Sequence, residues 1–159
     1  MATKILTTSE RYLNFSLGDE EFAIPLLSVR EVIAVPETTP IPHSPGYFLG
    51  IMNLRGQIIT ILDLRVKLGI KAVAKEENAV IICELMGLCI GIVVDSVNCV
   101  LAPRPEEISD HPEIHNSKAS EFITAVFRKD KKLILFIDLA KSLGFEDISV
   151  AKTQLEKAA

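Results

Sequence analysis

The sequence predicts an all-β domain that contains two copies of a small unit and a few short helices. Many short apolar or alternating runs are separated by turn signals, which is typical of barrels rather than of parallel α/β layers. Residues 50–69 also recur, in weaker form, over residues 125–144. Hydrophobic residues make up 48% of the 159 residues, which is enough to form a core and argues against disorder.

The first part of the chain is expected to form a hairpin. Residues 12–17 alternate apolar and polar positions, residues 18–20 have turn composition, and residues 21–24 return as a second strand that Pro25 ends. For residues 26–33 the spacing does not decide whether a helical turn runs into a strand. Four prolines then predict a loop that is neither helix nor central strand: Pro36, Pro40, Pro42 and Pro45.

Residues 50–69 place a polar turn between two apolar runs. The turn covers residues 53–56, and residues 57–62 have the composition of a buried strand. Asp63 is well placed to cap a short helix over residues 64–68, and Gly69 to end it. We therefore expect a hairpin followed by a single helical turn.

The second half of the chain repeats this order of elements. A charged linker over 71–78 precedes two apolar strands, 79–84 and 88–94. A polar loop region over 103–119 precedes a hairpin of residues 122–127 and 133–137, which turns at 129–132. Residues 138–144 repeat the pattern of cap, helix and glycine stop, and the tail over 146–159 is either a short amphipathic helix or a frayed end.

The repeat is visible residue by residue. When Asp63 is aligned with Asp138, five of the 20 positions of residues 50–69 are identical in the second copy. These are Ile59/Ile134, Asp63/Asp138, Leu64/Leu139, Leu68/Leu143 and Gly69/Gly144. Upstream, residues 22–24 match residues 90–92, and Ser28, Val29 and Val32 match Ser96, Val97 and Val100. Two collinear matching blocks indicate two copies of one β unit.

Composition excludes several functional classes. Seventeen basic and 21 acidic residues give a net charge of −4, which argues against nucleic-acid binding and against an anionic membrane surface. No apolar run approaches the ~18 residues of a membrane helix, and the N-terminus lacks a signal-peptide core, so we expect a cytosolic protein. Cys83, Cys89 and Cys99 lie in apolar runs and are expected to be buried free thiols.

No catalytic or metal-binding motif stands out, and we expect neither an enzyme nor a cofactor. The chain has no Gly-rich phosphate loop and no nucleophile elbow. His111 and His115 are four residues apart, but Pro112 replaces the glutamate of a zinc motif and no third ligand is evident. His43 has no obvious acidic partner.

Two polar positions are candidates for an interface, each with a simpler alternative. Arg55 falls in the polar turn, where the second copy has Asp130; it is either a solvated turn residue or an interface anchor. Arg30 and Glu31 interrupt an apolar run, where the second copy has Asn98 and Cys99. They either protect an edge strand or form the rim of a binding surface.

Several segments, taken in order, resemble the CheW family of chemotaxis coupling proteins. The segments include Val-Arg-Glu-Val at 29–32, Gly-Ile-Met-Asn-Leu-Arg-Gly at 50–56 and Ile-Leu-Asp-Leu-Arg at 61–65. Residues 12–24 and 91–95 also match, so the resemblance runs from about residue 12 to residue 144. Each segment is modest alone, but the ordered set is specific.

The resemblance implies a fold of two SH3-like, five-stranded β-barrel subdomains that share a hydrophobic core. Within a single domain of residues 1–159, the first subdomain would cover 11–78 and the second 79–145, with strand exchange between them left open. Residues 146–159 would form a C-terminal tail.

The resemblance also implies a non-catalytic adaptor between chemoreceptor cytoplasmic tips and the regulatory domain of the histidine kinase CheA. A receptor helix would lie in an apolar groove between the barrels, in the cytoplasm at membrane-associated receptor arrays. The positions implied for the receptor groove are Val29, Arg55, Ile58, Val97 and Val100, with Asn53 and Gly56 supporting the turn. The positions implied for kinase binding are Leu26, Glu31, Val32, Ala79 and Val80. Self-association into rings is left open.

The main alternative is a small-ligand-binding β-barrel that acts as a regulatory module. Such a protein needs a closed apolar pocket with a few convergent polar groups. The apolar residues are abundant, but no concentrated polar set lies within the interior runs.

Overall fold

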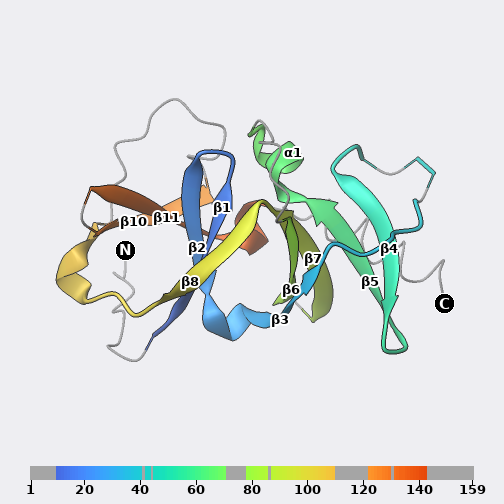
Figure 1. Ribbon diagram of the computed structural model, residues 1–159, viewed down its shortest axis with the longest axis horizontal. Coiled ribbons are helices and arrows are strands. Elements are labelled where there is room, and N and C mark those ends of the chain that lie inside the picture. The colour runs from blue at the N-terminus through green and yellow to red at the C-terminus, as the bar shows by residue number, and fades with distance from the viewer. Residues whose placement is uncertain are drawn as a thin grey trace.

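The computed structural model describes residues 10–40, 42–43, 45–70, 78–85, 87–109, 122–129 and 131–142. Most of them lie in two β-sheets, and the helices are single turns (Figure 1). The all-β fold class predicted from the sequence is therefore confirmed.

One sheet, here called sheet A, has six strands in the order β8-β1-β2-β11-β10-β9. Its strands are antiparallel except for the parallel pair β2 and β11. The sixth strand, β9, has only two residues, so five strands form the body of the sheet. The bounds are β1 (Tyr12–Leu17), β2 (Glu20–Pro25), β8 (Ser96–Leu101), β9 (Ile108–Ser109), β10 (Ile123–Lys129) and β11 (Lys132–Ile137).

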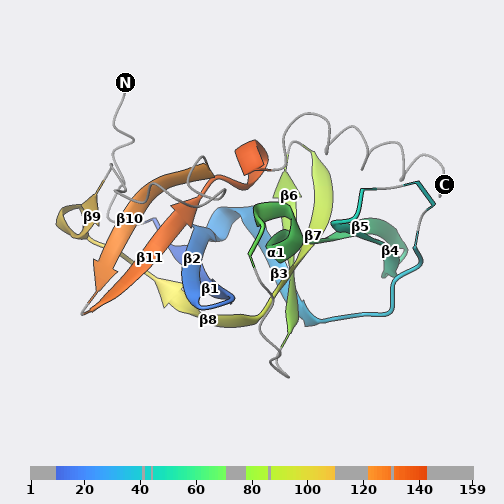
Figure 2. The same cartoon turned by 90° about the horizontal axis from the view of Figure 1, so that it is seen from above.

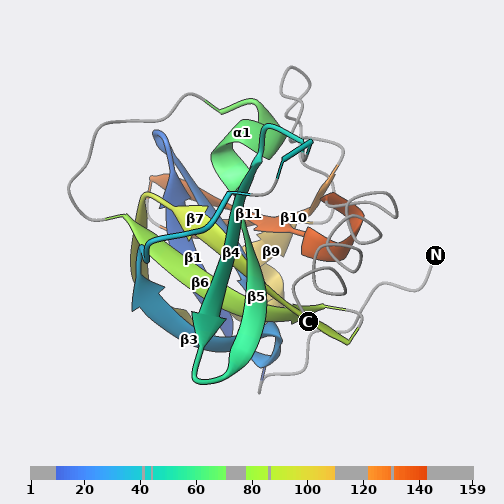
Figure 3. The ribbon, with the colours of Figure 1, turned by 90° about the vertical axis from the view of Figure 1, so that its right-hand side faces the viewer.

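The other sheet, sheet B, has five strands in the order β3-β6-β7-β5-β4, and here β5 and β7 are the parallel pair. Figure 2 shows the two sheets at opposite ends of the molecule, with the β4–β5 hairpin farthest from sheet A, and Figure 3 looks onto that end, with the hairpin in front. The bounds are β3 (Val29–Ala34), β4 (Phe48–Leu54), β5 (Gln57–Asp63), β6 (Ala79–Leu85) and β7 (Leu88–Val94).

The two sheets exchange strands between the two sequence copies. Sheet A takes β1 and β2 from the first copy, and sheet B takes β6 and β7 from the second. The registers of the two parallel pairs agree: Ile61 pairs with Gly91, and their repeat counterparts Phe136 and Ala23 also pair. The repeat is thus a real structural repeat. The subdomain boundaries 11–78 and 79–145 stay predictions. Each sheet contains strands from both sides of residue 78, so neither sheet coincides with one of these two ranges.

The helical turns form where the sequence provides caps. Helix α1 (Leu64–Leu68) begins after Asp63, whose side chain accepts a hydrogen bond from the Arg65 N–H, and ends at Gly69 with φ 70°. In the second copy, residues 139–142 are helical and Asp138 Oδ1 accepts from the Lys141 N–H at 3.0 Å. Both predicted caps are confirmed, and Gly144 lies outside the described residues.

Two 3₁₀ turns complete the secondary structure. η1 (Leu26–Ser28) runs directly into β3, which settles the segment that the spacing left undecided. η2 (Pro105–Glu107) lies at the start of the predicted polar loop, and β9 follows it. The rest of that loop, from residue 110, lies outside the described residues, as do residues 71–77 of the linker and the tail over 146–159.

One core cluster draws buried side chains from both sheets. Phe15 and Phe22 of sheet A pack in the same cluster as Leu62 and Ile92 of sheet B, and all four are fully buried. Each sheet also has a smaller cluster of its own. The shared cluster joins the barrels through apolar contact, the dominant stabilising term in folding.

Two expectations need correction. Cys83 and Cys89 are buried, but Cys99 is exposed, because β8 is an edge strand of sheet A. The polar turn is also narrower than residues 53–56: β4 continues through Leu54, which pairs with Gln57, so only Arg55 and Gly56 form the loop. In the second hairpin, β10 and β11 likewise extend to Lys129 and Lys132.

Candidate functional site

The β4–β5 turn holds Arg55 in an unusual backbone conformation. Arg55 has φ 51° and Gly56 has φ 86°, as in a two-residue type I′ hairpin turn. Asn53 Oδ1 accepts a hydrogen bond from the Gly56 N–H at 2.8 Å. Positive φ is unfavourable for a residue with a Cβ atom, and Asn or Gly is the usual first residue of such a turn. The turn therefore keeps an arginine at a conformational cost.

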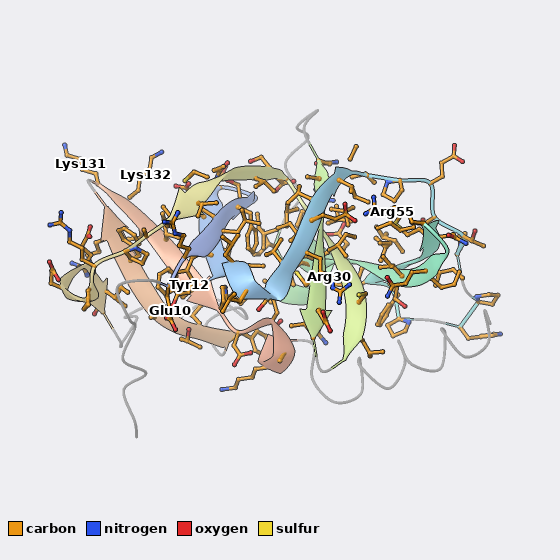
Figure 4. The ribbon with its side chains drawn as sticks, turned by 90° about the horizontal axis from the view of Figure 1, so that it is seen from below. Glu10, Tyr12, Arg30, Arg55, Lys131 and Lys132 are labelled. Carbon is orange, nitrogen blue, oxygen red and sulfur yellow. The ribbon has the colours of Figure 1, made fainter. Side chains whose placement is uncertain are left out.

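The side chain of Arg55 reaches across sheet B. Its Nη2 pairs with Glu31 Oε1 on β3, and β3 and β4 are the two edge strands of this sheet. The Arg55 side chain is 71% exposed and the Glu31 side chain 31% exposed. Figure 4 shows Arg55 beside the end of β3, with Arg30 farther along the same strand. A residue implied for receptor binding thus contacts one implied for kinase binding.

The other residues implied for the receptor groove lie on both sheets. Val29 on β3 and Ile58 on β5 belong to sheet B and are half-buried. Val97 and Val100 lie on β8 of sheet A, where Val97 is half-buried and Val100 is 48% exposed. Val29 and Val97 both pack against the shared core cluster. The set therefore draws residues from both sheets.

The residues implied for kinase binding gather around β3 and its neighbour β6. Glu31 and Val32 lie on β3, and the register pairs Ala34 with Ala79 at the start of β6. Val32 is exposed, and Ala79 is half-buried. Leu26, in η1 just before β3, is also half-buried.

Val80 is the exception among these positions. Its side chain is fully buried in the core cluster of sheet B, with Ile59, Ile61 and Ile82. Along β6, alternate side chains face opposite sides of the sheet, and that of Val80 faces the barrel interior. Val80 therefore has no side-chain surface for a partner, and its assignment as a contact residue is corrected.

Sequence reasoning missed a buried ionic network between the sheets. Arg65 of α1 donates to Asp95 Oδ1 at 2.6 Å and to both carboxylate oxygens of Asp63, at 3.0 and 2.9 Å. Hydrogen bonding to Asp63 raises the pKa of Arg65, whose guanidinium stays charged. The available signal was the presence of charged residues directly after apolar runs: Asp63 and Arg65 after residues 57–62, and Asp95 after residues 88–94.

A second missed feature is the ion pair of Arg30. Arg30 of β3 donates to Glu84 Oε2 of β6 at 2.8 and 2.5 Å. Both side chains are about half exposed, so the pair is screened by solvent and contributes little to stability. It gives β3 a second charged contact, which fits the expectation that charges protect an edge strand.

The surface also has an open hollow of about 460 Å³, which lies between the β1–β2 turn and the start of β11. It is lined by three carboxylates, one lysine and two leucines: Asp19, Glu20, Glu21, Lys132, Leu133 and Leu135. A small-ligand barrel would need a closed and mostly apolar pocket. This hollow gives that alternative no support.

The described residues contain neither a candidate metal site nor a candidate membrane helix. Among these residues, no group of three or more His, Cys, Asp or Glu side chains could hold a metal ion, and His111 and His115 lie outside them. Within this part of the chain, no helix has the length and apolar character needed to cross a membrane.

Comparisons with known proteins agree with this architecture. The family model described as a CheW-like domain matches residues 11–146. The chemotaxis protein CheW of Klebsiella aerogenes is 35% identical, with 91% of this chain and 87% of that protein aligned. The probable chemotaxis protein CheW of Rhizobium etli is 36% identical over 87% and 90% of the two chains.

A solved structure is also similar. The crystal structure of the scaffolding protein TtCheW from Thermoanaerobacter tengcongensis superposes with a TM-score of 0.77 at 29% sequence identity. The superposition covers 87% of this chain and 94% of TtCheW. The similarity therefore extends over nearly the whole of both chains.

Proposed function

Because this chain belongs to the CheW family of chemotaxis scaffold proteins, we propose that it couples chemoreceptor cytoplasmic tips to the regulatory domain of the histidine kinase CheA. Proteins of this family are scaffold adaptors, and the chain is not an enzyme. The proposed place of action is the cytoplasm, at membrane-associated receptor arrays. Self-association into rings, which the resemblance left open, stays a prediction.

The conformation of Arg55 carries the proposal. The turn would be more relaxed with Asn or Gly at this position, yet it holds an arginine at φ 51°. Backbone strain of this kind is concentrated at functional sites, where the surrounding structure holds the strained conformation in place. The guanidinium is mostly exposed, and arginine is a favoured anchor in protein interfaces. We infer that Arg55 is retained for a contact with a partner.

The proposed receptor face combines the two barrels. Arg55 and Ile58 at one end of sheet B, with Val29 on β3, supply a charged anchor and apolar contacts. Val97 and Val100 on β8 supply apolar contacts from sheet A. An amphipathic helix that lies in an apolar groove needs this combination of apolar contacts and a polar rim.

The proposed kinase face lies on the β3–β6 side of sheet B. It comprises Leu26, Glu31, Val32 and Ala79, and it excludes the buried Val80. Glu31 is the polar residue of this face and also the partner of Arg55. The two faces therefore meet at one ion pair, which a receptor or a kinase would contact from different sides.

The receptor face is tested by charge reversal. In calorimetric titration with a receptor-tip helical hairpin, Arg55→Glu is expected to lower affinity about tenfold or more, because an interface anchor is worth at least ~1.4 kcal/mol. Arg30→Glu is the matched control, since it also reverses an exposed arginine that pairs with one glutamate in sheet B. Normal tip binding by folded Arg55→Glu protein would refute the assignment.

The kinase face is tested separately. Glu31→Lys is expected to weaken binding to the isolated regulatory domain of CheA, because it reverses the charge of the central polar residue of that face. Unchanged affinity would count against the placement of the kinase face, and the receptor assignment would stand independently.

A further inference from the structure

Asp95 connects the two sheets through a buried carboxylate. It lies between β7 of sheet B and β8 of sheet A and is fully buried. Its Oδ2 accepts from the Gly18 N–H of the β1–β2 turn at 2.5 Å, and its Oδ1 accepts from Arg65 Nη1 at 2.6 Å. Arg65 is anchored in turn by Asp63 at the end of β5. The network thus joins the β1–β2 hairpin of sheet A to α1 and β5 of sheet B.

A buried network of this kind sets geometry more than it adds stability. Apolar side chains of similar size would stabilise such a junction as well or better, but without directional contacts. The planar guanidinium donates in fixed directions to two carboxylates, so it allows only a narrow range of orientations. Fully satisfied buried polar groups of this type rigidify the elements that they join.

The structural repeat shows that this connection is present on one side only. The repeat counterparts of Arg65 and Asp95 are Ala140 and Leu27. Leu27 is 98% exposed. Among the described residues, the side chain of Asp138, the counterpart of Asp63, accepts a hydrogen bond from the backbone N–H of Lys141 and from no arginine. The caps recur in both copies, whereas the ionic network does not. Helix capping alone therefore does not explain why an arginine stands at position 65 and an aspartate at position 95.

The network lies next to the strands that carry the proposed receptor contacts. Asp95 directly precedes β8, which bears Val97 and Val100. Arg65 lies in α1, which directly follows β5, the strand that bears Ile58 and begins at the Arg55 turn. A shift of one barrel against the other would change the separation of these two groups of contacts.

We propose that Arg65 and Asp95 are positioning residues that fix the placement of the two barrels, so that one receptor helix can contact β8 and the Arg55 turn together. This inference rests on the proposed function for its binding consequence, and on geometry alone for its structural consequence. The proposed kinase face lies on β3, η1 and β6, without a contribution from β8, so it does not depend on the placement of β8.

The structural consequence is tested by a distance measurement between spin labels at Gln57 of sheet B and Lys132 of sheet A, with Cys99 replaced by serine. Both residues are exposed, and Figure 4 shows Lys132 at the opposite end of the molecule from the Arg55 turn. Asp95→Asn and Arg65→Lys are expected to broaden the distance distribution. Arg30→Met, which breaks an ion pair within sheet B, is the control and should leave it unchanged. A distribution as narrow as that of the unmodified protein in folded variants would overturn the proposal.

The binding consequence is measured on the same variants. The affinity for a receptor-tip hairpin is expected to fall about tenfold, because preorganisation of the groove is lost, while the affinity for the kinase regulatory domain changes less than about twofold. An equal loss for both partners would indicate general destabilisation and contradict the positioning role. If the unmodified protein fails to bind the hairpin, the proposed function fails, and the spin-label distances still decide whether the network positions the barrels. Arg65→Lys keeps the positive charge at this position, so it is the variant that tests the proposal if Asp95→Asn does not fold.

Discussion

Arg55, in the turn that follows the edge strand β4 of sheet B, donates to Glu31 of the other edge strand, β3. One partner comes from a strained hairpin turn and the other from β3, so the pair links two segments that are far apart along sheet B. The same pair joins the proposed receptor face to the proposed kinase face. A partner that binds the side chain of Arg55 must therefore compete with Glu31, and a partner that binds Glu31 must compete with Arg55.

The first prediction concerns this ion pair. Because Arg55 is 71% exposed, we expect Arg55→Glu to change the free energy of unfolding by less than ~1 kcal/mol, while it disrupts receptor-tip binding. Thermal unfolding and calorimetric titration measure the two effects. The double variant Arg55→Glu with Glu31→Arg should recover the lost stability without recovering tip affinity. Recovered tip affinity would mean that the pair, rather than the arginine itself, matters for binding.

The second prediction concerns strain in the turn. Arg55→Gly relieves the positive φ but removes the ion pair, so the variant should be as stable as the unmodified protein or more stable by up to about 1 kcal/mol. Urea unfolding gives the comparison. Gly56→Ala is the control: its Cβ meets open space, so any loss of stability reports the positive φ alone. A large loss of stability in Arg55→Gly would show that the arginine is structural.

The third prediction concerns Gly50, where β4 approaches the preceding loop. A Cβ atom at this position would overlap the carbonyl oxygen of Thr39 and lie 2.7 Å from its carbonyl carbon. The backbone φ of 143° adds strain, so Gly50→Ala should lower the free energy of unfolding by about 3 kcal/mol. Gly46→Ala meets no atom within 4 Å and is the matched control. Equal unfolding midpoints for the two variants would contradict this close packing.

The fourth prediction concerns the three thiols. Cys99 is exposed, whereas Cys83 and Cys89 are buried, and burial raises the pKa of the Cys83 thiol to about 12. At pH 8 the Cys83 thiol is protonated and inaccessible, so Cys99 alone should react rapidly with a chromogenic disulfide reagent. Cys99→Ser should abolish the fast phase, and urea should expose the other two thiols. A second fast thiol in the folded protein would contradict the described core.

Much of the fold could be predicted because it depends on local rules. The Asp63 cap, the Gly69 stop and the first hairpin follow from capping preferences and from alternation along a strand. The repeat also identified equivalent elements in the two copies. The repeat could not show which strands of the two copies pair with each other. Strand exchange preserves every local sequence pattern and changes only the long-range pairing partners.

The site was less predictable for the same physical reason. Arg55 and Glu31 were each singled out by their sequence context, but their contact depends on the closure of sheet B. The prediction for Val80 was wrong because resemblance identifies a position and not the side of the sheet that its side chain faces. Cys99 was expected to be buried because β8 is apolar, although an edge strand leaves part of its surface open.

The central claim is that one molecule binds a receptor tip and a kinase at the same time. The most direct measurement is size-exclusion chromatography with light scattering on a mixture of this protein, a receptor-tip hairpin and the regulatory domain of CheA. We predict one complex that contains all three components, which Arg55→Glu reduces to the pair with the kinase domain. If the kinase domain instead displaces the receptor hairpin, or if neither binds, the account of this protein as a coupling scaffold is contradicted.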